Sequence, residues 1–145
     1  MFNFLKKNKE TEKKLENNNE LLSKTASLLI HAAKMDQKYS DEEKEIIRKT
    51  MIELGCEDES IDEMLIIAEK NESDSNQILD FTREIKNTDD NFKTKLIEAL
   101  WRIIFSDNKA DMYESSLMRR LAGLLYLDNK TLGEIKEQIK KKLNQ

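Results

Sequence analysis

The chain has 145 residues, no proline, no valine, three glycines and a formal net charge of −4. Its apolar residues are mainly Leu, Ile, Met and Ala, a set that favours helices over strands. The negative net charge gives no electrostatic support to a nucleic-acid partner. The single Cys56 excludes an internal disulfide and any site built from several cysteines. We therefore expect one all-α domain, a compact bundle of about seven helices.

The first 18 residues differ in composition from the rest. Residues 6–20 are almost wholly Lys, Glu, Asn and Thr. Such residues bury too little apolar surface to offset the entropy of ordering. Residues 1–18 are therefore predicted to be a flexible, charged and at most loosely helical N-terminal arm, and residues 19–145 to be the helical domain.

The arm begins with an apolar and basic segment, in which Phe2, Phe4 and Leu5 are followed by Lys6 and Lys7. Such a segment suits a membrane surface or a partner protein, or it folds back on the bundle. No apolar stretch approaches the ~20 residues needed to span a bilayer, and the chain does not begin with a secretory signal. We expect a cytoplasmic protein, and peripheral attachment to the inner membrane through this segment is the alternative.

Apolar spacing and capping residues predict seven helices, at about residues 19–35, 40–55, 58–71, 75–86, 89–106, 112–125 and from 129 to the lysines at 140–142. Ser40 and Glu43 form a capping box at the start of the second helix, and Gly55 ends that helix. The caps expected for later helices are Asp74 or Ser75, Asp111 and Asp128. The fifth helix is apolar on most sides, which places Trp101 in the core.

One corner of the chain occurs twice, at a constant offset of 71 residues. Asp36 ends the first helix and Glu43 lies in the first turn of the next; Asp107 and Glu114 repeat this arrangement. The apolar positions that follow and the pair Arg48 and Arg119 keep the same offset. We therefore expect an internal pseudo-twofold helix-turn-helix repeat.

These four acids have two explanations. Asp at a helix–helix turn bonds the following amides, and Glu in a first turn completes a capping box. If the two corners instead lie together, four carboxylates crowd one another and must take up protons, pair with the two arginines or bind a cation. Oxygen ligands alone suit Ca²⁺ or Mg²⁺. The predicted metal ligands are Asp36, Glu43, Asp107 and Glu114.

The chain has none of the common enzyme motifs: no nucleophile elbow, P-loop, Gly-rich dinucleotide turn or His-Glu-x-x-His. His31, the single histidine, is expected at the rim of the bundle. Cys56 is expected to be a small packing residue. We therefore predict no catalytic residue, and no cofactor other than a divalent cation at the corners.

The corners resemble the TerB domain of tellurite-resistance proteins, in particular its stand-alone, uncharacterised branch. The resemblance covers about residues 19–140 and rests on Leu29 to Asp36, Ser40 to Glu43, Leu96 to Asp107, Tyr113-Glu114 and Arg119 to Ala122. The Gly usual after each Asp is Gln37 here, and Asn108 in the second copy.

The resemblance implies an all-α fold, a divalent-cation or ligand role for Asp36, Glu43, Asp107 and Glu114, membership of a bacterial stress-response system, and no established catalytic activity. We also expect protein partners. Three functions follow. The first is a non-catalytic module that binds a cation or a partner through its acidic corners. The second is a membrane-peripheral adaptor that docks by Phe2, Phe4 and Leu5. The third is a metal-dependent enzyme acting on a phosphate-bearing substrate.

Overall fold

The computed structural model describes residues 2–35, 39–75, 77–106 and 112–144, with side chains from residue 18 in the first helix and from residue 116 in the sixth. Within these ranges the chain forms seven α-helices, one 3-10 helix and no strand, which confirms the all-α prediction. The elements are α1 (Phe2–Lys34), α2 (Asp41–Glu53), α3 (Ile61–Asp74), α4 (Leu79–Thr82), η1 (Ile85–Asn87), α5 (Asp90–Ser106), α6 (Met112–Leu124) and α7 (Asn129–Leu143).

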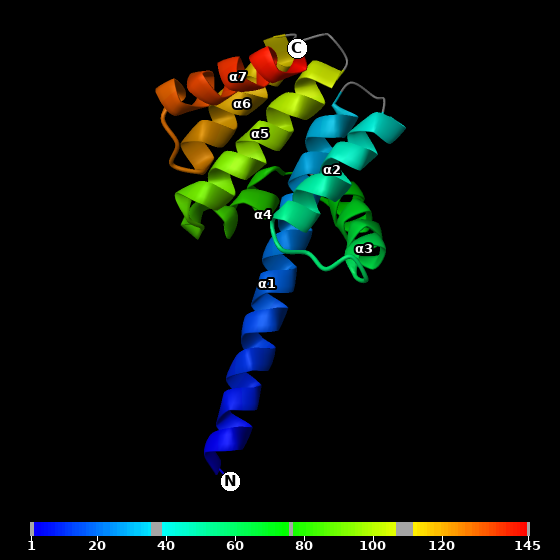
Figure 1. Cartoon of the computed structure of the whole chain (residues 1–145), viewed down its shortest axis with the longest axis vertical. Helices are drawn as coiled ribbons and strands as arrows, with labels where there is room; N and C mark the ends of the chain where they lie inside the picture. The colour runs from blue at the N-terminus through cyan, green and yellow to red at the C-terminus, as the bar shows by residue number, and fades with distance from the viewer. Residues whose placement is uncertain (1, 36–38, 76, 107–111, 145) are drawn as a thin grey trace.

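Two helices organise the core. α1 packs against α2, α3, α4 and α5, and α5 packs against α1, α2 and α7 (Figure 1). The buried apolar residues of these helices form one continuous cluster. Trp101 is 3% exposed, as predicted, and its ring stacks on Phe105 with centroids 5.8 Å apart. Lys136 lies with its Nζ 5.2 Å from the centre of the Trp101 ring.

α1 is a single helix of 33 residues that begins at Phe2, so the prediction of a first helix starting at about residue 19 is wrong at that end. At 1.5 Å per residue it is about 50 Å long, and its first half extends away from the bundle (Figure 1). Leu22 is buried whereas residues 18–20 are exposed, so the bundle begins near residue 21. No helix in the described part of the chain is both long and apolar enough to cross a membrane.

Several predicted helix ends are confirmed. Gly55 follows α2 with φ +115°, the left-handed region that glycine tolerates. Asp128 caps α7 by accepting a hydrogen bond from the Thr131 backbone N at 2.6 Å. The lysines at 140–142 occupy the last turn of α7, where the helix dipole favours cations. The predicted cap Asp111 lies outside the described residues.

The prediction of one helix over residues 75–86, capped by Asp74 or Ser75, is wrong. Asp74 is the last residue of α3 and Ser75 caps its C-terminal end. The Ser75 hydroxyl donates to Asp80 at 2.5 Å. The described residues 77–87 beyond it form only the four-residue α4 and the three-residue η1.

Candidate functional site

Of the four predicted metal ligands, the structure describes one completely. Asp36 and Asp107 lie outside the described residues. Glu114 lies in the first turn of α6, but its side chain is also outside them. Glu43 lies in the first turn of α2 and is 1% exposed.

Glu43 completes the predicted capping box. Its Oε1 accepts hydrogen bonds from the Ser40 backbone N at 3.0 Å and from the Ser40 hydroxyl at 2.9 Å. The Ser40 hydroxyl in turn accepts from the Glu43 backbone N at 3.1 Å. The positive end of the α2 dipole also stabilises a carboxylate at this position. The capping role of Glu43 is thus confirmed, and the carboxylate is held in one fixed position.

Tyr39 shows that the surroundings of this corner are acidic. Burial of its phenol, followed by the negative charges of Glu69, Glu43 and Glu72 and a hydrogen bond with Glu69, raises the pKa of Tyr39 to about 12. Glu69 and Glu72 belong to α3, so α3 adds two carboxylates to the surroundings of the first corner. Sequence reasoning missed all three residues. The two glutamates share one face of a helix, but only the packing of α3 on α1 shows which way that face points.

Glu72 joins α3 to the last turns of α1. It is 11% exposed, and its two oxygens lie 2.9 Å from Lys34 Nζ and 3.4 Å from His31 Nδ1. Burial makes a lone carboxylate costly, so a lysine partner stabilises it. His31 is 36% exposed and lies at the rim, as predicted.

Residues close in sequence to both corners line a hollow of about 280 Å³. It is lined by His31 and Met35 at the end of α1, by Gln77 and Ile78, and by Ser116, Leu117 and Arg120 of α6. Met35 directly precedes Asp36, and Ser116 follows Glu114 by two residues. In Figure 1, α1 and α5, which lead into the two corners, end at the same end of the bundle.

The comparison with known families agrees with this arrangement of helices. The sequence model of the family described as tellurite resistance protein TerB matches residues 22–137. The chain belongs to the TerB family. No curated protein and no solved structure matches it. The matched range lies within the one expected from the resemblance, and the N-terminal arm falls outside it.

Among the described side chains, no group of three or more His, Cys, Asp or Glu residues is arranged to hold a metal ion. The donors near the first corner are carboxylate and phenol oxygens, which suit a hard cation. Arg48, one of the arginines considered as a partner for the corner acids, instead pairs with Asp62 of α3. Arg119 is exposed on α6.

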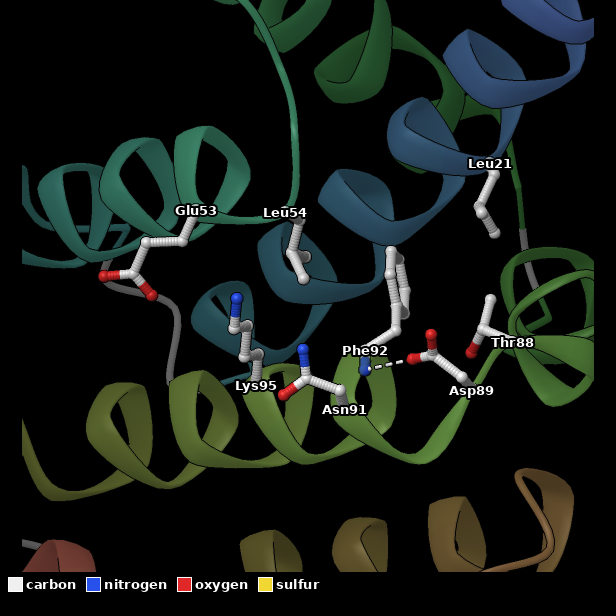
Figure 2. A pocket seen from close by; sticks show the side chains of 8 residues that line it. All are labelled: Leu21, Glu53, Leu54, Thr88, Asp89, Asn91, Phe92 and Lys95. Atoms are coloured by element: carbon white, nitrogen blue, oxygen red, sulfur yellow. Dashed lines mark hydrogen bonds between the residues drawn. The ribbon is translucent and has the colours of Figure 1, made fainter.

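A second hollow of the TerB domain, about 440 Å³, lies between α1, α2 and the start of α5 (Figure 2). Leu21, Leu54 and Phe92 line one side, and Glu53 and Lys95 come from facing helices. Asp89 caps α5 by accepting a hydrogen bond from the Phe92 backbone N at 2.8 Å. The Asp89 carboxylate therefore has a structural role. No metal-binding group of side chains is found among the described residues of this hollow.

Proposed function

We propose that this helical module of the TerB family is non-catalytic and binds a divalent cation or a protein partner through the face that carries its two acidic corners. The predicted ligands are Asp36, Glu43, Asp107 and Glu114, and the cation is Ca²⁺ or Mg²⁺ because all the ligand atoms are carboxylate oxygens. The chain is thereby proposed to serve a tellurite-related stress response by recognition, without catalysis.

One observation carries this proposal. The hollow between α1 and α6 is lined by the residue next to Asp36 and by residues just after Glu114. Two acidic corners that flank one hollow would bring carboxylates from distant parts of the chain together. Their repulsion favours a bound cation or a cationic group of a partner.

Thermal unfolding in the presence of added ions tests the cation. Millimolar Ca²⁺ or Mg²⁺ should raise the melting temperature in a dose-dependent way, because a ligand that binds only the folded state stabilises it. Asp107→Asn and Glu114→Gln should each remove this shift, since each deletes a charge and keeps the shape of the side chain.

Glu137→Gln is the matched control, because Glu137 is an exposed carboxylate on α7. It should leave the ion-dependent shift unchanged. The cation is ruled out if neither ion shifts the melting temperature of the unaltered chain. If Asp107→Asn lowers stability equally with and without ions, the corner acids act as caps or as partners of nearby cations.

A further inference from the structure

A groove of about 460 Å³, lined by both apolar and polar side chains, lies between α1 and α3, close to the point where α1 leaves the bundle. Leu22 and Ser23 of α1, Cys56, and Met64 and Ile67 of α3 contribute to its walls. Ile67 is 47% exposed, so a large apolar side chain remains open to solvent on this wall. Contact with an apolar segment would remove that surface from water.

Acidic residues lie close to the groove along the chain, because residues 57–59 fall between its lining residues Cys56 and Ser60. Glu57, Asp58 and Glu59 are exposed in the connection between α2 and α3, and Glu63 lines the groove itself. None of these four forms a salt bridge with a described residue. A groove that combines apolar side chains with nearby acids fits a segment that is apolar and then basic.

The chain itself contains a segment of this kind. Phe2, Phe4 and Leu5 supply three large apolar side chains, and Lys6, Lys7 and Lys9 follow directly. This segment cannot reach the groove of its own chain, because both lie on the same unbroken helix. Residue 5 and residue 22 are separated by about 25 Å along that helix. A second copy of the chain has no such restriction.

We propose that residues 2–9 of one copy dock in the α1–α3 groove of a second copy, and that the exchange is reciprocal. The two N-terminal arms then run antiparallel, with residue 5 of one level with residue 20 of the other, and Glu20 lines the groove. At this register residues 9 and 16 lie opposite each other, as do residues 12 and 13. These pairs are Lys9 with Glu16 and Glu12 with Lys13, which have opposite charges.

Pairing also explains why the arm is helical. Most helical stability in proteins comes from packing, which the arm would gain from a partner. The first half of α1 extends from the bundle in Figure 1. A second arm alongside provides both contact area and ion pairs. The same surface patch on each copy makes the contact, which gives the closed twofold symmetry common among dimers.

Sedimentation velocity of the full chain over the micromolar to hundred-micromolar range tests the dimer. The unaltered chain should convert from monomer to dimer, and added salt should weaken the association because it screens the charges near the groove. Ile67→Asp should weaken the association at least about tenfold. Phe4→Asp should do the same from the other side of the contact.

Ile66→Asp is the matched control. Ile66 is the neighbouring residue and is 69% exposed, but it does not line the groove. This variant should dimerise like the unaltered chain. Both α3 variants should fold, since both side chains are exposed, and circular dichroism checks this. An equimolar mixture of Ile67→Asp and Phe4→Asp should recover dimer, because one tip and one groove remain intact.

Three results would overturn the proposal: a chain that stays monomeric over the whole range, a dimer insensitive to Ile67→Asp, or equal losses from Ile66→Asp and Ile67→Asp. Flotation with anionic vesicles tests the alternative that this segment binds a membrane surface. If the unaltered chain stays monomeric and binds vesicles in a way that Phe4→Asp abolishes, the segment recognises a lipid surface and the dimer proposal fails.

Discussion

At the start of α2, Ser40 and Glu43 satisfy each other's polar groups. Each side chain accepts from the backbone N of the other, and the serine hydroxyl also donates to the glutamate. Glu43 is buried, so losing a donor leaves part of a buried carboxylate without its hydrogen bond. Ser40→Ala should therefore lower the free energy of unfolding by about 1–2 kcal/mol. Denaturant unfolding measures this, with Ser73→Ala on the exposed face of α3 as the control; equal values for the two variants would contradict it.

Tyr39 gives the first corner a dependence on alkaline pH. Below the ordinary tyrosine pKa of 10.0 the phenol is protonated in both folded and unfolded chains, so its contribution to stability is complete. Above that pH the unfolded chain loses the proton first, whereas the folded chain keeps it until about pH 12 because burial and Glu69 raise the pKa. The folded state therefore loses stability between these pH values.

Tyr39→Phe lacks this titration. Its free energy of unfolding should fall less steeply than that of the unaltered chain between about pH 10 and pH 12. Denaturant unfolding at several alkaline pH values compares the two slopes. Parallel curves for the two proteins would show that Tyr39 has an ordinary environment.

At the scale of the elements, the sequence predicted helices well where apolar stripes and caps agree. It placed the start of α1 about 17 residues too late, because residues 6–18 carry almost no apolar stripe. α5 and α7 begin and end within about a residue or two of the predicted positions, the usual uncertainty of helix boundaries. The fourth helix failed for a physical reason. Ile78, Phe81 and Ile85 are all buried, and their spacing is that of a helix. Two short helical turns in succession can bury residues at the same spacing. The hydroxyls of Thr82 and Thr88 bond carbonyls three residues earlier, which is compatible with such turns.

The candidate site was predictable only in part. The Ser-x-x-Glu pattern identified the capping role of Glu43, since a capping box is local in sequence. The contribution of Glu69 and Glu72 depends on how α3 packs against α1, and no local pattern encodes that. The pairing of Arg48 with Asp62 is likewise set by the packing of α2 and α3. The 71-residue repeat and the second corner's acids remain predictions.

The N-terminal half of α1 should add little to the stability of a single copy. It extends from the bundle in Figure 1, and Leu22 is the first buried residue among the side chains of α1 that the structure describes. Deleting residues 1–15 should change the free energy of unfolding by less than about 2 kcal/mol at low protein concentration. Denaturant unfolding below the micromolar range measures this. A larger loss would show that the arm packs on its own bundle.

At the scale of the whole molecule, the described helices share one core, so we expect them to unfold together. Far-UV circular dichroism should show a helical spectrum without appreciable strand. The fluorescence of Trp101, the single tryptophan, should be blue-shifted and poorly quenched because the side chain is buried. The two signals should change at the same denaturant concentration, as a two-state transition requires. Separate midpoints would indicate that the α1–α3 side and the α5–α7 side unfold independently.

The rate at which Cys56 reacts with a thiol reagent would report on the groove between α1 and α3. Cys56 carries the only thiol of the chain and it contributes to the groove wall. Burial, and then the charges of Glu57 and Asp58, raises its pKa, so reaction with an alkylating reagent at neutral pH should be slow and limited by local opening. The labelling rate then reports how often this edge of the bundle opens. If a second copy occupies the groove, labelling should slow as protein concentration rises. The labelling rate of this one thiol would then report both local opening and occupancy of the groove.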